Sequence, residues 1–226
     1  MIEFLLEDLS EVIVHLDGSL STQDIQQSAA QYTLVLGSIA EESIGVIQDP
    51  AGSAIGSEMP PIGGGLSGAI YRRFYLDPIP FIEPGDSVFN GSEFGKRILH
   101  THSPQLFAVE NIWEATRCIT RAYLSAITVF VDSAERHGEQ VLNLCAVSAG
   151  IYAGRFQHPE YQHLHPSITQ VALVMALSTY NQRHPNALDP FALRLFYFGD
   201  PAAPTPLFTV AEEVHSTLMA LSPATL

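Results

Sequence analysis

The sequence predicts an α/β fold in which a mainly parallel sheet lies between helical layers. Short β-rich runs alternate with segments of helical periodicity along the 226 residues. One run, QVLNLCAVS (residues 140–148), is almost continuously apolar, as is typical of a strand covered on both faces. No repeat, charge block or linker divides the chain. We therefore expect a single domain over residues 1–226, with residues 1–30 as an N-terminal extension or extra strand and helix, and about residues 32–226 as the core.

The first half of the chain contains four predicted strands and two predicted helices. EVIVHL (11–16), YTLVLG (32–37) and SIGVIQD (43–49) are β-rich, and a polar helix that starts near Ser21 or Thr22 separates the first two. LSGAIYRRF (66–74) is a predicted helix. The proline-rich stretch DPIPFIEPGD (77–86) is predicted to be a loop, and KRILHTH (96–102) is a strand.

The second half begins with the longest predicted helix, which Ser103 and Pro104 open and Gly138 ends. Its apolar residues recur every three or four positions and predict a stripe that faces the core. After strand 140–148 we expect a helix over about residues 167–183, a strand ALRLFYFGD (192–200) and a final helix near 210–221. The members of the apolar stripe are Val109, Ile112, Trp113, Ile119, Tyr123, Ile127 and Phe130.

Charge and cysteine content limit the partners and the setting. The chain has 24 acidic and 10 basic residues, a formal net charge of −14 and Lys96 as its single lysine. It therefore lacks the clustered Lys and Arg that bind nucleic acid or anionic membranes, and we expect neither partner. Cys118 and Cys145 lie in apolar segments and are predicted to be reduced thiols. The acidic N-terminus and the short apolar runs predict a cytoplasmic protein without a signal peptide or membrane span.

Three consecutive glycines, Gly63, Gly64 and Gly65, directly precede the predicted helix 66–74. Glycines in a row cost conformational entropy, so either a flexible turn or a special backbone conformation is indicated. In the second case, backbone N–H groups at the helix N-terminus would bind an anion, a route that is open to an acidic protein. Ligands of parallel α/β folds gather at the carboxyl ends of strands, where SAGIYAG (148–154) and FGD (198–200) also lie.

Three segments resemble, in the same order and spacing, motifs of the ADP-ribose-binding macrodomain family. GVIQDPAGSAIGSEMPPIGGGLSGAIYR (45–72) resembles N-A-A-N…G-G-G-G-V-D-G-A-I-H, KRILHTHSP (96–104) resembles V-I-H-T-V-G-P, and AVSAGIYAG (146–154) resembles A-I-S-T-G-V-Y-G. The resemblance covers about residues 32–199. It implies a three-layer α/β/α fold with a mixed, mainly parallel sheet, no cofactor, and ADP-ribose or a mono-ADP-ribosylated protein as partner.

The resemblance also implies roles for individual residues. Two glycine-containing loops would clamp the diphosphate through backbone amides, Tyr152 would lie beside the distal ribose, and Phe198 would stack on adenine. The residues that it places at the ligand are Ser38, Ile39, Asp49, Gly52, Gly63, Gly64, Gly65, Ser148, Ala149, Gly150, Ile151, Tyr152 and Phe198.

The chain departs from the family pattern at several of these positions. The motif G-D-I-T reads G-S-I-A (37–40), so Ser38 offers only a neutral hydrogen bond to adenine. The two motif asparagines fall on Asp49 and Gly52, and the Asp that follows the glycines in hydrolytic members is Ser67. We therefore expect binding with weak or no hydrolysis. Two alternatives stay open: a mono-ADP-ribosyl hydrolase in which Asp49 substitutes for the missing residue, and a protein-interaction module that retains the fold without nucleotide binding.

Other chemistries have less support in the sequence. The histidines of HPEYQHLHP (158–166) lack a cysteine partner and a regular helical spacing, so a solvated loop is favoured over a zinc site. Ser148 lacks the G-x-S-x-G context of a hydrolase nucleophile. Asp49 and Asp86 are interpreted as isolated loop acids, and His100 and His102 as strand residues that are bonded within the fold. The members of the histidine group are His158, His163 and His165.

Overall fold

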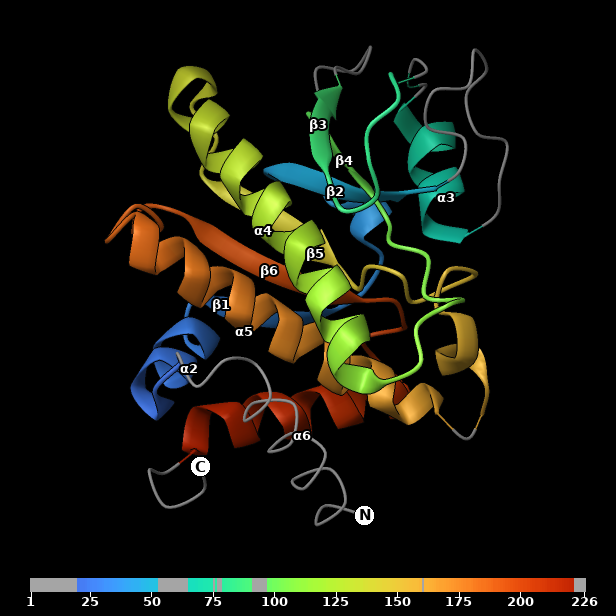
Figure 1. The fold of residues 1–226 in the computed structure, drawn as a ribbon. Helices are drawn as coiled ribbons and strands as arrows, with labels where there is room; N and C mark the ends of the chain where they lie inside the picture. Colours follow the sequence, from blue (N-terminus) through green and yellow to red (C-terminus); the bar gives the residue numbers. More distant parts are fainter. Residues whose placement is uncertain are drawn as a thin grey trace.

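The computed structural model describes residues 20–52, 65–74, 76, 79–90, 97–159 and 161–221. In this part of the chain, six strands form one sheet with the order β1-β6-β5-β2-β4-β3 (Figure 1). All neighbouring strands are parallel except β3, which pairs with β4 in the antiparallel direction at one edge. The predicted α/β class with a mixed, mainly parallel sheet is confirmed. The strands are β1 (Tyr32–Leu36), β2 (Val46–Ala51), β3 (Ser87–Asn90), β4 (Ile98–His102), β5 (Val141–Cys145) and β6 (Ala192–Tyr197).

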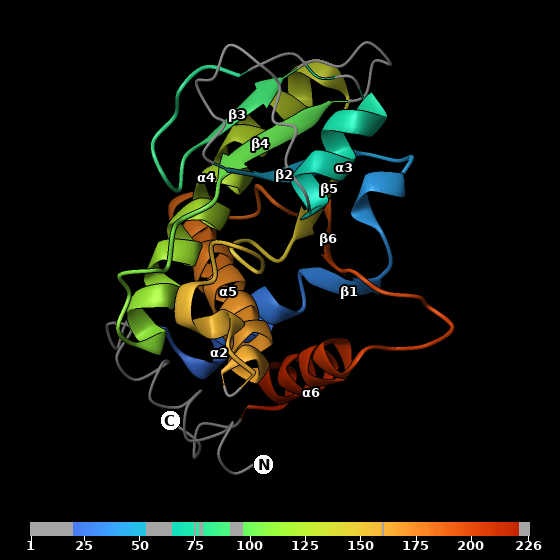
Figure 2. The same cartoon turned by 90° about the vertical axis from the view of Figure 1, so that its right-hand side faces the viewer.

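Helices cover both faces of this sheet. Helices α4 and α5 pack against each other on one face, and α2 and α6 pack against α5 near the β1 edge. Helix α3 and the short 3-10 helix η1 lie on the opposite face, so that Figure 2 shows the sheet between α4 and α5 on one side and α3 on the other. The helices are α2 (Thr22–Ala29), η1 (Ile39–Glu41), α3 (Gly65–Phe74), α4 (Ile112–His137), η2 (Gly154–Gln157), η3 (Gln162–Leu164), α5 (His165–Arg183) and α6 (Pro206–Ala220).

Each face of the sheet has its own apolar layer. The larger layer joins the buried residues of α4 and α5, including Ile119, Tyr123 and Phe130, to the strand residues on that face. The predicted stripe of α4 is therefore correct over its central turns, whereas Trp113 near the helix start is only half-buried. The smaller layer packs Ile70 and other residues of α3 against the opposite face of the strands.

Helix starts follow from their capping residues. Ser21 and Asp24 form a reciprocal capping box, which confirms the expected start of α2. The prediction that Ser103 and Pro104 open the long helix is wrong: α4 begins at Ile112, because the side chain of Asn111 accepts a hydrogen bond from the amide of Glu114 at 2.9 Å. Similarly, Thr205 caps α6, which starts at Pro206, four residues before the expected position.

Two strands depart from the sequence-based expectation. The short edge strand β3 follows directly after the proline-rich segment and was not predicted. Strand β2 extends two residues beyond the expected end, through Pro50 to Ala51. Pro50 is tolerated because the pairing of β2 with β5 ends at Ile47, so the missing amide donor falls beyond that ladder. The strand expected over residues 11–16 lies outside the described residues.

Candidate functional site

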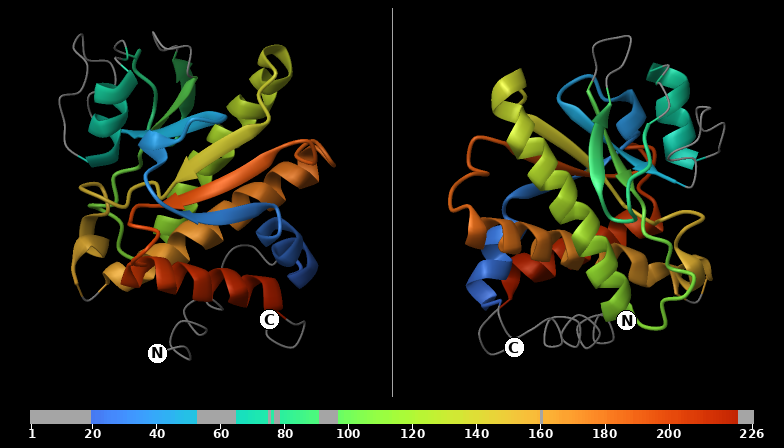
Figure 3. Two further views of the ribbon diagram at one scale, coloured as in Figure 1. Left: turned by 180° about the vertical axis from the view of Figure 1, so that it is seen from behind. Right: turned by 45° about the horizontal axis from the view of Figure 1, so that its top comes forward.

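The carboxyl ends of four adjacent parallel strands, β1, β6, β5 and β2, lie along one edge of the sheet (Figures 1 and 3). The segments that follow these strands therefore lie side by side. They start at Gly37, Phe198, Ala146 and Gly52. The amide of Gly37 donates to the carbonyl of Tyr197 at 2.9 Å, which keeps the ends of β1 and β6 together. This edge is the candidate functional site, as expected for ligand sites of parallel α/β folds.

The loop after β5 presents bare backbone to solvent. Ser148 has a φ of +56°, in the left-handed region that a non-glycine residue rarely adopts, and Ala149 and Gly150 are exposed. The Ser148 hydroxyl donates to the carbonyl of Pro104 at 2.6 Å and so holds this corner. A Cβ on Gly150 would meet no atom within 4 Å. A left-handed residue in such a turn aims successive N–H groups into one concavity, an arrangement that suits anions.

The far side of this loop is fixed against the segment after β4. The amide of Leu106 donates to the carbonyl of Tyr152 at 2.9 Å. Gly154 has a φ of +56°, and a Cβ there would lie 2.3 Å from the carbonyl oxygen of Leu106. Only glycine fits at this position, because a side chain would strike backbone atoms. Gln157 adds a hydrogen bond from its side-chain amide to the carbonyl of Gly150 at 2.6 Å.

His165, the first residue of α5, is buried close to the same loop. Burial lowers the pKa of His165 to about 4, and the neighbouring backbone of Ser148 and Val147 opposes this shift only in part. The ring Nδ1 lies 3.2 Å from the hydroxyl of Thr169. His165 is therefore a neutral support of the loop at physiological pH.

Tyr152 reaches from the β5 loop to the end of β2. A Cβ with ideal geometry on Gly52 would lie 2.6 Å from the Tyr152 hydroxyl oxygen and 2.9 Å from its Cε2 atom. The tyrosine thus occupies the space that a side chain at position 52 would need. The two residues that the sequence assigned to the distal ribose are brought into contact.

Strands β2 and β5 are joined differently toward this edge. Their backbone pairing is confined to Val46 with Leu142 and Ile47 with Asn143. Beyond it, the fully buried side chain of Gln48 accepts from the amide of Cys145 at 3.1 Å and donates to the Thr101 hydroxyl at 3.0 Å. A side chain thus replaces a ladder hydrogen bond here and satisfies the Cys145 amide where the regular ladder stops.

Asp49 lies elsewhere than expected. The interpretation of this residue as an isolated loop carboxylate is wrong: Asp49 lies within β2, is fully buried, and its Oδ2 lies 2.7 Å from Nδ1 of His100 on β4. The Tyr71 hydroxyl of α3 lies 3.5 Å from the same ring nitrogen. The Asp49 side chain therefore faces α3 and has no surface that a ligand could contact. Sequence reasoning missed this cluster, although apolar residues on both sides of position 49 indicated a buried strand.

The predictions for His100 and His102 are confirmed, whereas that for Asp86 is not. His100 and His102 are strand residues bonded within the fold, as predicted, since His102 Nδ1 lies 2.7 Å from the carbonyl of Ile82. Asp86 is a turn residue whose carboxylate accepts from Arg121 at 2.9 Å, so it is paired rather than isolated.

The glycine-rich stretch is described only at its end. Gly65 is exposed, has a φ of +70° and is the first residue of α3, one position before the predicted helix start at Leu66. Gly63 and Gly64 lie outside the described residues. Ser67, two residues into the helix, is half-buried, and among the described residues its hydroxyl has no hydrogen-bond partner.

The β1 and β6 end of the site contains the exposed aromatic residue. Phe198 follows β6 and has 82% of its surface exposed, and Ile151 in the β5 loop has 72% exposed. Ser38 is half-buried at the start of η1, where its side chain makes no capping hydrogen bond. Ile39, which the resemblance also places at the ligand, is buried in the apolar layer under α3.

Other chemistries find little support. The described residues contain no group of three or more His, Cys, Asp or Glu that could hold a metal ion. Cys118 and Cys145 are free thiols.

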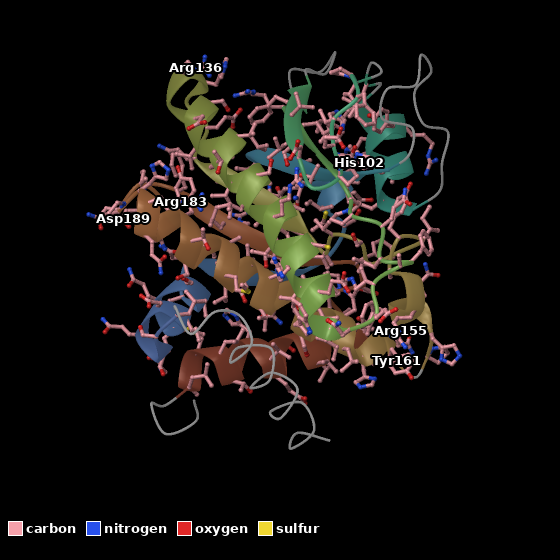
Figure 4. The ribbon with its side chains drawn as sticks, viewed as in Figure 1. His102, Arg136, Arg155, Tyr161, Arg183 and Asp189 are labelled. Carbon is pink, nitrogen blue, oxygen red and sulfur yellow. The ribbon has the colours of Figure 1, made fainter. Side chains whose placement is uncertain are left out.

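A polar cavity of about 230 Å³ lies between α2 and the end of α5, near Gln31 and Asp189. Figure 4 shows Asp189 far from Arg155, which follows the β5 loop, so this cavity lies at the amino ends of the strands and is separate from the candidate site. Within the described ranges, no helix is long and apolar enough to cross a membrane.

Solved structures share this fold. The chain matches the Trypanosoma brucei macrodomain in complex with ADP at 16% identity and a TM-score of 0.55, over 83% of this chain and 70% of that one. It matches an Oceanobacillus iheyensis macrodomain mutant with ADPR at 16% identity and a TM-score of 0.55, over 82% and 92% of the two chains. A second T. brucei structure, in complex with ADP-ribose, matches at 16% identity and a TM-score of 0.50, over 81% and 68%.

Three further results limit the conclusion from these structural similarities to the fold. The chain also spans 23% of the alphavirus P23pro-zbd chain, at a TM-score of 0.49, which is too low to support an argument. No model of a protein family matches the sequence, and no curated protein matches it significantly. The chain has the macrodomain fold, which confirms the fold that the sequence resemblance implied.

Proposed function

We propose that this chain binds ADP-ribose or mono-ADP-ribosylated protein at the carboxyl edge of its sheet, with weak or no hydrolysis. The observation that carries the proposal is the convergence at that edge of an exposed aromatic ring, Phe198, and the loop after β5, in which Ala149 and Gly150 are exposed beside the left-handed Ser148. An aromatic face suits a base, and outward amides suit a diphosphate. Macrodomains of the same fold have been solved with ADP and with ADP-ribose, which supports this choice of ligand.

The charge of the chain fits recognition by backbone amides. The segments 37–39, 148–152 and 198–200 contain no Lys or Arg. A diphosphate bound there would depend on N–H groups, and the N-terminus of α3 at Gly65 would add the positive end of its helix dipole. A protein with a net charge of −14 therefore retains a route to an anionic ligand.

Weak hydrolysis follows from the residues at the other end of the site. Attack at the anomeric carbon needs an oriented water and a stabilised, positively charged transition state. Gly52 and Ser67, the positions that correspond to the missing family Asn and Asp, supply neither an amide nor a carboxylate. Asp49 is buried against His100. Phosphate binding alone stabilises ground and transition states equally, so it does not raise kcat.

Calorimetric titration with ADP-ribose tests the binding. We expect a Kd in the micromolar to tens-of-micromolar range, which corresponds to about −6 to −8 kcal/mol. Gly150→Glu places a carboxylate in open space beside the loop amides and should abolish binding, as should Gly64→Glu in the glycine stretch. Ala192→Glu is the matched control, because it adds the same charge at the exposed amino end of β6. Retained affinity in both glycine variants would show that the loops are not the site.

Two outcomes would favour one of the alternative functions, a protein-interaction module or a hydrolase. Absence of heat and of a thermal shift with millimolar ADP-ribose would favour a protein-interaction module that retains only the fold. A time course with stoichiometric protein on an auto-modified transferase measures hydrolysis. Complete release within minutes would refute the binder. If Asp49→Asn, which keeps the shape of the buried side chain, then lost that release without a change in thermal midpoint, Asp49 would be assigned a positioning role in hydrolysis.

A further inference from the structure

The order of the strands gives the proposed ligand a direction. Phe198 follows β6, the Ser148 to Gly150 backbone follows β5, and Gly52 follows β2, the next strand in the sheet. A nucleotide whose base lies on Phe198 and whose diphosphate lies on the β5 loop therefore extends toward Gly52. The inference below rests on the proposed function, because it concerns the group beyond the diphosphate.

The β2 end of this path is occupied by Tyr152. A Cβ on Gly52 would lie 2.6 Å from the Tyr152 hydroxyl and 2.9 Å from its ring, distances that real Cβ atoms do not reach. Glycine at position 52 and tyrosine at position 152 are thus mutually dependent. The hydroxyl end of the Tyr152 ring therefore lies beside Gly52 at the end of β2.

The backbone on both sides of Tyr152 is fixed. Its carbonyl accepts from Leu106 at 2.9 Å, and the next amide, that of Ala153, donates to the carbonyl of Gly150 at 2.9 Å. Gly154 is pressed against the backbone of Leu106. A side chain carried by so constrained a backbone has few positions, so moving the ring away from Gly52 would require a rotamer change or a shift of the loop.

We infer that Tyr152, seated on Gly52, closes the β2 end of the site, so that the chain recognises the ADP part of its ligand. A ribose beyond the diphosphate finds no side-chain amide at position 52 and meets the tyrosine ring. This distal ribose, and any protein attached to it, would lie outside the site beside Tyr152. A nucleoside diphosphate is therefore a sufficient ligand, and the distal sugar adds little affinity.

Calorimetry with ADP and ADP-ribose separates this inference from its alternatives. For the wild type we expect affinities within about threefold of each other, because contacts that are not made contribute nothing. Tyr152→Phe keeps the ring on Gly52 and should leave the ratio unchanged. The double variant Tyr152→Ala/Gly52→Asn opens the end and adds an amide, so it should favour ADP-ribose over ADP by at least about fivefold, with ADP affinity retained.

Results that contradict the Tyr152 inference can be distinguished from results that contradict the proposed function. A wild-type preference for ADP-ribose above about tenfold would overturn the inference, as would a Tyr152→Ala variant that loses affinity for ADP-ribose but not for ADP. If neither nucleotide binds the wild type at millimolar concentration, the proposed function fails and the inference fails with it. The contact itself is tested without ligand: Gly52→Ala should lower the thermal midpoint in the wild type but not in the Tyr152→Ala background. An equal loss in both backgrounds would show that Tyr152 does not occupy the position.

Discussion

The two faces of the sheet are built on different principles, although the same strands form both. Under α4 and α5 the layer is large, with Tyr123, Ile127 and Phe130 fully buried, and it also encloses neutral polar side chains such as Thr169 and Gln170. Under α3 the apolar layer is smaller and encloses Asp49 and His100, two fully buried polar residues. The first face supplies the bulk of the burial and joins sheet to helix through neutral hydrogen bonds, such as that of Tyr123 to the carbonyl of Cys145, whereas the second buries a carboxylate paired with an imidazole.

Strand β2 shows how one sequence serves both faces. Val46 belongs to the layer under α4 and α5, and Ile47 belongs to the layer under α3. With the alternation of a strand, Asp49 follows Ile47 onto the α3 face. There it raises the pKa values of the Tyr71 hydroxyl and the Cys145 thiol, although burial is the larger cause for both groups. The Asp49 carboxylate therefore acts on side chains of both α3 and β5.

Removal of Asp49 should give the largest effect on this comparison. Asp49→Ala leaves His100 buried without its partner, and the free energy of unfolding should fall by about 3 to 5 kcal/mol, as for other broken buried pairs. Urea unfolding measures this loss. In a double-mutant cycle with His100→Ala, the double variant should cost less than the sum of the single variants, because the two residues interact directly.

The surface pair of the same chemistry provides the control. Asp86 accepts from Arg121 at 2.9 Å with both side chains largely exposed. Asp86→Ala should cost less than about 1 kcal/mol, since solvent screens exposed pairs. Equal losses at positions 49 and 86 would contradict the distinction between the buried pair and the exposed pair, and additive losses in the cycle would show that Asp49 and His100 act independently.

Much of the fold could be predicted from the sequence because periodicity reports burial. The stripe of α4 and the continuous apolar run of β5 each follow from the face that the element buries. The start of α4 could not be found in this way. Ser103 and Pro104 resemble a helix start, but tertiary bonds to Ala51 and Ser148 hold them in an extended connection.

The candidate site could be predicted only in the segments that resemble macrodomain motifs. The resemblance located the loop after β5 and Phe198 after β6, but the contact between Gly52 and Tyr152 joins residues 100 positions apart, which no local pattern reports. Asp49 was misplaced because the following proline indicated a turn. Pro104 and Leu106 support the loop through their backbone groups, and backbone contacts leave no signature in residue type.

His165 provides a test on the α5 side of the sheet, because it is a buried titratable residue there. Its pKa is about 4 in the folded protein and 6.5 in the reference state. The unfolded chain therefore takes up a proton below about pH 6.5, whereas the folded protein does so only near pH 4. Stability is full above this window and falls as pH drops through it, by about 3 kcal/mol in total.

The measurement compares unfolding free energies at pH 7.5 and 4.5. His165→Gln should lose about 2 kcal/mol less over this range than the wild type, because carboxylates titrate in both proteins and only the histidine contribution is removed. Ile168→Val, a change at a buried apolar residue of the same helix, should keep the wild-type pH dependence. An unchanged pH dependence in His165→Gln would mean that its ring is not held neutral by burial.

The smallest predicted effect is that of Ser38→Asp on ADP-ribose binding at the carboxyl edge of the sheet. Ser38 follows β1 beside Phe198, because the amide of Gly37 bonds to Tyr197. Its side chain makes no capping hydrogen bond, so Ser38→Asp removes no existing capping contact. A carboxylate here would accept from an adenine amino group by a charge-assisted bond. We expect ADP-ribose binding to tighten by about 1 to 2 kcal/mol, with a gain in preference for adenine over other bases.

Calorimetry of wild type and Ser38→Asp with ADP-ribose measures this gain. Ser216→Asp adds the same charge on an exposed turn of α6 and should not tighten binding, so it separates a local hydrogen bond from the general effect of one more negative charge. Because the chain is already strongly acidic, added negative charge by itself opposes an anionic ligand. Tighter binding at position 38 alone therefore requires a direct contact with the base. Unchanged or weaker binding would mean that adenine does not lie between Ser38 and Phe198, and that the direction assigned to the ligand along the strand ends is wrong.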